Sequence, residues 1–342
     1  TLGSILLLII IVIALFMFQL SPVSKDDTVI EFEVAKGSTY STLASSLKEA
    51  GLIRSPLAYK IYVKVTNPES LEAGKYPLSK NMGVSKIVEV LSGGNTYNPD
   101  AVTISIPEGR NIEQVAEYVA DVIDLSEEEL LEVWDSPEFV DQVIEKYWFV
   151  TDEVKNEDIR HPLEGYLFPS TYELTSKEVS AEYVAYRMLD QMDVVLSKYR
   201  EDIETSRYSV HELLTMASIV EYEAILDEDR PVVAGVFYNR LAIDMKLQSC
   251  ATLGYAIGEW KLTYTTKDMN TDSKYNTYYY YGLPVGPGGM PSKASIEAAI
   301  YPDSNDYYYF MANVCDATSQ KTYFAKTLAE HEENVRKYLT CF

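Results

Sequence analysis

Histidine and cysteine are scarce in this chain of 342 residues. It contains 3 His and 3 Cys, and no two cysteines form a CxxC pair. The histidines, at positions 161, 211 and 331, lie far apart in sequence. Neither residue type has the spacing of a zinc site, so we expect no metal and no cofactor. The odd number of widely spaced cysteines also argues against a disulfide framework.

Basic residues are too few for a nucleic-acid-binding protein. Lys and Arg number 29 against 52 Asp and Glu, which gives a net charge of −23. Such a chain repels phosphate, and nucleic acid is not expected as a partner. No GxSxG turn is present, although a Ser–His–Asp site that assembles only in space stays open. The composition, 47% hydrophobic and 24% charged, suits two or three folded domains.

One long apolar run is present, at the start of the sequence. Residues 2–20 are interrupted only by Gly3, Ser4 and Gln19. About 19 apolar residues can cross the roughly 30 Å core of a bilayer. The following segment, QLSPVSKDD, has no evident signal-peptide cleavage site. The run therefore predicts an uncleaved single-pass anchor at residues 1–22, in the cell membrane, with the remaining chain extracytoplasmic; a buried core helix is the alternative.

The next part of the chain contains a strand–helix–helix–strand pattern that occurs twice. Residues 28–97 form the first copy, and residues 98–175 form the second with an acidic helical insertion near residues 126–147. The segment VAKG at residues 34–37 matches IPEG at residues 106–109. Alternating strands combined with helical patterns predict an α+β fold with two small α/β units.

Residues 176–342 are mainly helical in pattern. Ser209 and Glu212 form a capping box that opens one helix, and Thr327 and Glu330 open the last one. Residues 307–314 and 322–325 alternate and predict a β-hairpin. The long segment 261–291 is rich in Gly, Pro, Asn and Tyr, and a loop of that length is usually functional.

The helix opened by Ser209 contains ASIVEYEA, residues 217–224. Because a helix turns 100° per residue, Glu221 and Glu223 point about 200° apart. Glu221 follows a stripe of apolar and small residues, whereas the face of Glu223 leads to the acidic segment DED at residues 227–229. Burial raises a carboxyl pKa, which suits a general acid, so Glu221 is the candidate and Glu223 is expected to face water. A structural pairing of Glu221 with Arg230 or Arg240 remains equally open.

Several long motifs resemble one known family, the YceG-like endolytic murein transglycosylases. They are, in order, LEGYLFPSTYEL, ASIVEYEA, RPVVAGVFYNRLAIDMKLQSCAT, YNTYYYYGLPVGPGGMPSKASIEAA, YYYFMANV and YFAKTLAEHEENVRKYL. The resemblance covers nearly the whole chain. It implies a LysM-like module at residues 28–97 and a YceG-like catalytic domain at residues 98–342, with its catalytic core at residues 176–342.

The resemblance also implies a reaction. The family cleaves the β-1,4 bond between N-acetylmuramic acid and N-acetylglucosamine without water: the muramyl O6 attacks C1 and leaves a 1,6-anhydro end. The catalytic glutamate is expected at the first Glu of the motif, Glu221. Expected partners are peptidoglycan glycan strands, the cytoplasmic membrane and penicillin-binding synthases. The matching motifs place these residues in or near the cleft: Glu164, Tyr166, Asn239, Gln248, Ser249, Tyr275, Asn276 and Thr277.

The sequence departs from the family pattern at one point near the expected cleft. Where Gln-Ser-Asp-Pro-Thr is common, this chain has Gln-Ser-Cys-Ala-Thr at residues 248–252, so an acidic side chain is missing. Two other functions stay open. One is a hydrolytic muramidase, in which a second carboxylate such as Glu164 positions water. The other is a non-catalytic glycan-binding scaffold of the cell-wall machinery.

Overall fold

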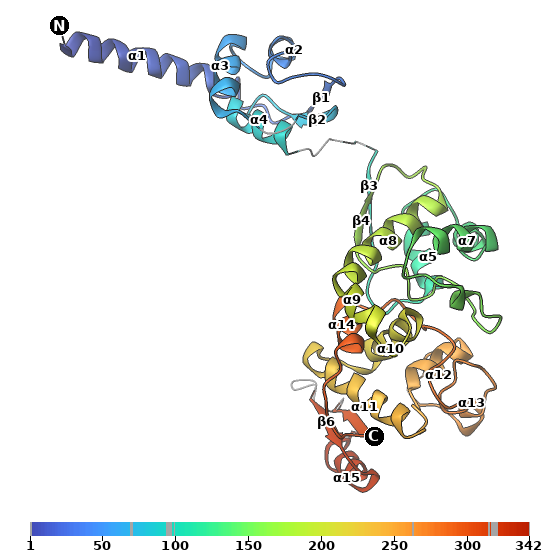
Figure 1. Ribbon diagram of the computed structural model, residues 1–342. Coiled ribbons are helices and arrows are strands. Elements are labelled where there is room, and N and C mark those ends of the chain that lie inside the picture. Colours follow the sequence, from blue (N-terminus) through green and yellow to red (C-terminus); the bar gives the residue numbers. More distant parts are fainter. Residues whose placement is uncertain are drawn as a thin grey trace. The chain divides into compact units, whose positions relative to one another are not determined.

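The computed structural model describes residues 2–68, 71–93, 98, 100–261, 263–313, 315 and 321–341. The fold is α+β: helices dominate, and the strands of the described part form two-stranded antiparallel sheets. The chain divides into two compact units, residues 1–100 and residues 101–342 (Figure 1). Each unit has its own buried core.

The first unit begins with α1 (Leu2–Leu20). Among the residues whose side chains are described, no helix combines the length and the apolarity needed to cross a membrane. Beyond α1, strand β1 (Ile30–Val34) pairs antiparallel with β2 (Gly74–Leu78), so that Phe32 lies opposite Tyr76. These strands bury one face against three helices: α2 (Leu43–Glu49), α3 (Pro56–Thr66) and α4 (Val84–Ser92).

The second unit starts with a similar pairing. Strand β3 (Val102–Ser105) lies antiparallel to β4 (Thr171–Leu174). The segment between them holds α5 (Ile112–Ala120), α6 (Glu127–Trp134), α7 (Pro137–Lys146) and the short 3₁₀ helix η1 (Asp152–Lys155). Helices α6 and α7 are the predicted acidic insertion, and each begins at a serine whose side chain caps the first turn.

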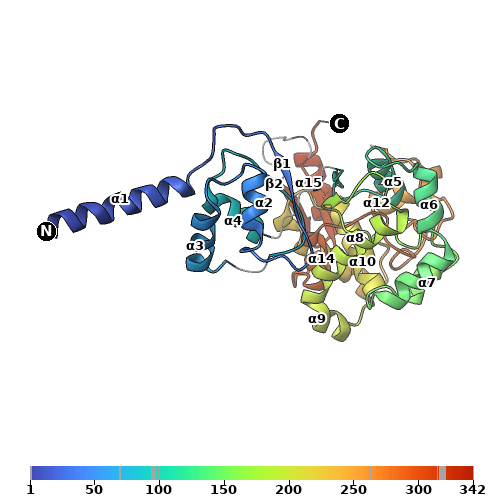
Figure 2. The same ribbon diagram turned by 90° about the horizontal axis from the view of Figure 1, so that it is seen from above.

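Helix α10 (Val210–Glu223) lies at the centre of the second unit. It begins at the predicted capping box of Ser209 and Glu212 and is buried on nearly all sides from His211 to Val220. It packs against α11 (Arg230–Ala242) and α14 (Lys293–Ile300), and Figure 2 shows α14 beside it. The remaining helices of this part are α8 (Ala181–Leu196), η2 (Ser197–Tyr199), α9 (Arg200–Thr205), η3 (Asp227–Asp229), α12 (Cys250–Ile257) and α13 (Thr266–Met269).

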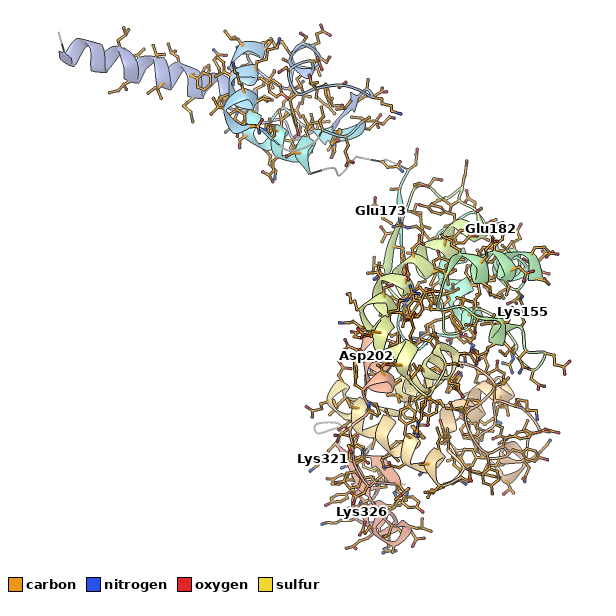
Figure 3. The ribbon with its side chains drawn as sticks, in the orientation of Figure 1. Lys155, Glu173, Glu182, Asp202, Lys321 and Lys326 are labelled. Atoms are coloured by element: carbon orange, nitrogen blue, oxygen red, sulfur yellow. A yellow bond between two sulfur atoms is a disulfide. The ribbon has the colours of Figure 1, made fainter. Side chains whose placement is uncertain are left out.

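The predicted hairpin near the C-terminus is present. Strands β5 (Tyr309–Ala312) and β6 (Thr322–Ala325) pair antiparallel, and α15 (Leu328–Tyr338) packs against both. Lys321 and Lys326 flank β6 (Figure 3). Most of the predicted turn lies outside the described residues. The Thr327–Glu330 capping box opens α15 as expected.

The prediction of no disulfide is wrong. Cys315, beyond β5, and Cys341, beyond α15, form a disulfide with their Cα atoms 5.5 Å apart. The two cysteines are 26 residues apart in sequence, and they meet because α15 folds back on the hairpin. Spacing along the sequence did not show this proximity in space. Cys250 is the remaining cysteine, and it is free and exposed.

Candidate active site

The last turn of α10 carries two glutamates that point into different surroundings. Glu221 accepts a hydrogen bond from the backbone N–H of Ser292, the residue that caps α14, at 2.8 Å. Glu223 accepts hydrogen bonds from the backbone N–H groups of Cys250 and Ala251 at the start of α12. The helical phase separates the two carboxylates, and each occupies a helix N-terminus, where backbone N–H groups favour negative charge.

Glu221 forms an ion pair with Arg230. Arg230 Nη1 lies 3.2 Å from Oε2 of Glu221, and the two side chains are 9% and 8% exposed. Arg230 also binds Asp227 through Nε at 2.8 Å and the hydroxyl of Ser295. Of the two readings left open by the sequence, the structure therefore contains the pairing of Glu221 with Arg230.

Glu108, in the loop between β3 and α5, is a neighbour of Glu221 that the sequence reasoning missed. Burial raises the pKa of Glu108, and the negative charge of Glu221 raises it further, whereas Arg230 lowers it. The next residue, Gly109, has φ +72°, and a Cβ there would lie 3.6 Å from Cγ of Glu221. The sequence signal for Glu108 was the IPEG turn that contains it, which was interpreted only as part of the repeat.

Glu223 is half-buried between α10 and the start of α12. The hydroxyl of Ser249 donates to its Oε1 at 2.6 Å. Burial raises the pKa of Glu223, and this effect outweighs the hydrogen bonds and the charge of Arg240, which lower it. The prediction that Glu223 faces water is met only in part, because Glu223 is half-buried, as Glu221 is. Its face is covered by α12 and the segment before it, which are distant in sequence and invisible to helical phase alone.

Glu223 lies on the wall of a pocket of about 300 Å³. The pocket is formed by α10, α11, the start of α12, strand β5 and α15. Its described lining combines aromatic rings with hydrogen-bonding groups: Glu223, Phe237, Arg240, Leu247, Gln248, Ser249, Cys250, Tyr278, Tyr309, Phe310, Leu328 and His331. Glu223 is the only carboxyl in this lining, and this volume is at the lower end for small-ligand sites.

Arg240 is fixed inside this pocket by the protein backbone. Its Nη1 donates to Leu247 O at 2.6 Å, and its Nε donates to Tyr308 O at 2.7 Å. Its guanidinium also lies over the ring of Tyr309, 5.5 Å from the centroid. Because its position is fixed before any ligand binds, Arg240 supplies a preorganised positive charge near Glu223.

Two predicted site residues, Gln248 and Ser249, line the pocket. Gln248 has φ +48°, a strained conformation for a residue with a side chain. Thr277 stabilises this turn: its carbonyl accepts from Gln248 N at 3.2 Å, and its hydroxyl accepts from Ser249 N at 3.0 Å. Thr277 is 1% exposed, so it supports the wall rather than contacting a ligand.

The predicted residues Tyr275 and Asn276 also serve the loop. Asn276 is fully buried, and its Nδ2 donates to Met269 O and Thr271 O at 3.1 and 2.8 Å. Tyr275 lines a separate cavity of about 10 Å³, and its hydroxyl accepts from Arg160 N at 3.2 Å. Neither residue lines the pocket of Glu223.

The other three predicted residues lie away from the pocket. Asn239 donates to the carbonyls of Asn305 and Tyr307 and so holds the segment before β5. Tyr166 is fully buried, with its hydroxyl bonded to Nδ1 of His211 at 2.9 Å. The core encloses Tyr166, so the prediction that Tyr166 contacts substrate directly is wrong.

Glu164 is buried as well. It is 1% exposed and accepts hydrogen bonds from Ile112 N at 3.1 Å and from the hydroxyl of Tyr255 at 2.9 Å. Burial raises its pKa to about 7. Glu164 thus occupies the N-terminus of α5, enclosed by protein, and substrate contact is excluded for it by the same argument.

Cys250 stands where the family has an acidic residue. Its Sγ lies 3.2 Å from the hydroxyl of Tyr278, and both side chains line the pocket. Burial raises the pKa of the Cys250 thiol, and Glu223 adds to the effect. At neutral pH this position therefore presents a neutral thiol. Among the described residues, no group of three His, Cys, Asp or Glu is placed to hold a metal ion.

Comparisons with known proteins agree with this architecture. The YceG-like family model matches residues 32–337. An endolytic murein transglycosylase of Bacillus subtilis is 38% identical over 94% of this chain and 88% of the relative. One from Streptococcus pneumoniae is 36% identical over 90% of this chain, which spans 58% of that relative. The crystal structure of a yceG-like protein from Listeria monocytogenes is 41% identical, with a TM-score of 0.63, over 89% of this chain and 98% of that one. The chain therefore belongs to the YceG-like family.

Proposed function

We propose that the chain is an endolytic lytic transglycosylase of peptidoglycan. It cleaves the β-1,4 bond between N-acetylmuramic acid and N-acetylglucosamine inside glycan strands. The observation that carries this proposal is Glu223, a carboxyl with a raised pKa on the wall of a pocket of about 300 Å³ lined by aromatic and hydrogen-bonding groups. The names of the B. subtilis and S. pneumoniae relatives support the same activity.

In this mechanism one carboxyl acts twice. Protonated Glu223 donates its proton to the glycosidic oxygen as the bond from that oxygen to C1 breaks. The muramyl O6 then bonds to C1 and gives its proton to the Glu223 carboxylate, which restores the acid. The nucleophile belongs to the substrate, so proximity is built in and no second carboxylate is needed.

The surroundings of Glu223 suit both steps. Burial favours the neutral acid that protonates the leaving oxygen. The donors around it, namely Ser249 and the first N–H groups of α12, stabilise the carboxylate that then accepts the proton from O6. Because both effects act on the same carboxyl, that group can give a proton and regain it.

The geometry supports Glu223 over Glu221 as this carboxyl. The carboxyl of Glu221 already forms an ion pair with Arg230 and a hydrogen bond with the backbone N–H of Ser292. Both carboxyl oxygens of Glu221 therefore have protein partners, which compete with a glycosidic oxygen for this carboxyl. Glu221 also lies outside the described lining of the pocket. We therefore give Glu221 a structural role at the start of α14 and retain it as the alternative acid.

A hydrolytic muramidase is less consistent with the site. Hydrolysis by two carboxylates needs the second one close to the scissile bond to hold water or act as nucleophile. Glu164, the candidate for that role, is enclosed and bonded to Ile112 N and Tyr255. With Glu223 as the only carboxyl in the described lining, the pocket favours the intramolecular reaction.

The test is mass spectrometry of peptidoglycan digested by the native chain, Glu223→Gln and Glu221→Gln. We expect 1,6-anhydro ends from the native chain, loss of cleavage in Glu223→Gln and residual cleavage in Glu221→Gln. The reverse order would return the catalytic role to Glu221. Reducing ends would identify a muramidase, and binding without cleavage by all three proteins would identify a glycan-binding scaffold.

The location and the first unit complete the proposal. Leu8, Leu15 and Phe18 of α1 are 62%, 60% and 56% exposed, and we propose that this apolar surface attaches the chain to the cytoplasmic membrane with the second unit outside. A disulfide is typical of oxidising, extracytoplasmic surroundings, which agrees with this side. Membrane fractionation of the full chain and of a variant lacking residues 2–20 tests the attachment.

The strand–helix–helix–strand arrangement of residues 28–97 would act as a LysM-like glycan-binding module, beside penicillin-binding synthases.

A further inference from the structure

His331 reaches the pocket of Glu223 from the far end of the chain. It lies in the first turn of α15, and that helix packs against β5 and β6. Its side chain lines the pocket together with Tyr309 and Arg240. It lies in the last of the quoted motifs, 108 residues from Glu223, and the sequence comparison assigned it no role.

The His331 ring has an unmet hydrogen-bonding capacity. Its Nδ1 is buried and has no hydrogen-bond partner in the described part of the chain. Buried polar atoms are nearly always paired, because an unpaired one destabilises the fold. The ring packs nearly parallel to that of Tyr309, with centroids 5.5 Å apart and planes at 25°. Nδ1 is enclosed by protein, whereas Nε2 is not buried in this way and has no hydrogen-bond partner among the described residues, so Nε2 is the ring atom that a ligand in the pocket can reach.

The charges around His331 favour the neutral ring. Burial and the nearby positive charge of Arg240 lower the pKa of His331, against a smaller opposite effect of Glu332. A neutral imidazole has one donor and one acceptor nitrogen. Through Nε2 the neutral ring can accept from a hydroxyl group or donate to an N-acetyl carbonyl of an uncharged amino sugar. It does not match an anion, which would prefer a protonated ring.

We propose that His331 is a substrate-binding residue that hydrogen-bonds through Nε2 to an N-acetylated sugar ring seated in the Glu223 pocket. The Tyr309 ring that fixes its orientation is part of the same wall. This inference rests on the proposed function. It adds the C-terminal helix α15 to the glycan site, whose other polar groups come from α10, α11 and the start of α12.

The test measures binding without cleavage. A peptide-free glycan tetrasaccharide is titrated by calorimetry against the Glu223→Gln chain and against the same chain carrying His331→Phe, His331→Gln or Glu333→Ala. His331→Phe keeps a ring against Tyr309 but removes both nitrogens. Glu333→Ala changes an exposed residue of the same helix and is the matched control. We expect about tenfold weaker binding for His331→Phe, the loss of about one good hydrogen bond, and partial recovery for His331→Gln.

Equal affinities for His331→Phe and Glu333→Ala would overturn the proposal. Melting temperatures, measured for every variant, verify that each one folds, and His331→Gln supplies the comparison if the Phe variant does not. Failure of the proposed reaction looks different: the native chain would give no 1,6-anhydro ends, while the binding difference between the His331 and Glu333 variants would persist.

Discussion

Ser249 donates its hydroxyl proton to Glu223 over 2.6 Å, and the same side chain caps α12 by accepting from Thr252 N. One small residue therefore joins a candidate catalytic carboxyl to the start of a helix. Removing the hydroxyl affects both the protonation of Glu223 and the stability of α12.

Ser249→Ala is expected to move the alkaline limb of the kcat/KM profile to higher pH. The hydrogen bond from Ser249 lowers the pKa of Glu223, so its loss raises that pKa and keeps the acid protonated further into the alkaline range. Loss of the cap costs about 1 kcal/mol of stability. The measurement is cleavage rate against pH.

Ser180→Ala is the control for this prediction. Ser180 caps α8 by accepting from Tyr183 N, and it lies outside the described lining of the pocket. It should lower stability by a similar amount and leave the pH profile in place. A similar pH shift in both variants would contradict the role given to Ser249.

Glu221→Gln is expected to destabilise the second unit by about 3 kcal/mol, because it leaves Arg230 with a broken buried pair. Arg230→Met should have a comparable cost, and the double variant should lose clearly less than the two single losses added together. Urea denaturation of the four proteins provides the cycle. Strict additivity would show that the pair is not coupled.

The raised pKa of Glu164 predicts that the stability of the chain depends on pH. Its pKa is raised from 4.5 to about 7, so between these values the native chain keeps a proton that the unfolded chain has lost. Stability therefore falls as the pH rises from about 4.5 to about 7, by about 3 kcal/mol for this 1%-exposed group.

Glu164→Gln retains an acceptor oxygen for Ile112 N and should remove this part of the slope. The readout is the difference between the native and variant unfolding free energies at several pH values. That difference excludes the contribution of Glu223, whose pKa is also raised. Parallel curves for the two proteins would refute the assignment.

The disulfide should stabilise the second unit. Closing a loop of 26 residues restricts the unfolded chain and is worth about 3 kcal/mol. The double variant Cys315→Ser with Cys341→Ser should melt at a lower temperature and should not respond to a reducing agent. Cys250→Ser, which changes the free thiol, should keep the native melting temperature and the native response to reduction.

Local patterns predicted the elements well because their causes are local. The capping boxes at Ser209 and Thr327 open α10 and α15, and alternation indicated the pairing of β5 with β6. Helical phase also separated Glu221 from Glu223. The caps and the helical phase depend on residues within one helical turn, and the hairpin joins neighbouring segments of the chain.

The site was harder to predict because its contacts are long-range. Glu223 meets Ser249 from 26 residues away, and Arg230 reaches Glu221 across a turn between two helices. An apolar stripe on a helix shows that another element packs against it. It does not show whether that element also places an arginine next to the stripe. The family motifs placed Gln248 and Ser249 at the pocket, whereas other motif residues such as Tyr166 and Asn276 lie in the interior.

The two glutamates of α10 also fix the register of two other helices. One accepts from the N-terminus of α14 and the other from the N-terminus of α12. A single tyrosine, Tyr222, separates them in sequence. Inserting or deleting one residue there would rotate one carboxylate by about 100° and detach a helix start. The spacing between Glu221 and Glu223 therefore constrains how α14 and α12 are placed. The last turn of α10 sets the angle between these two helices, and α12 forms a wall of the pocket.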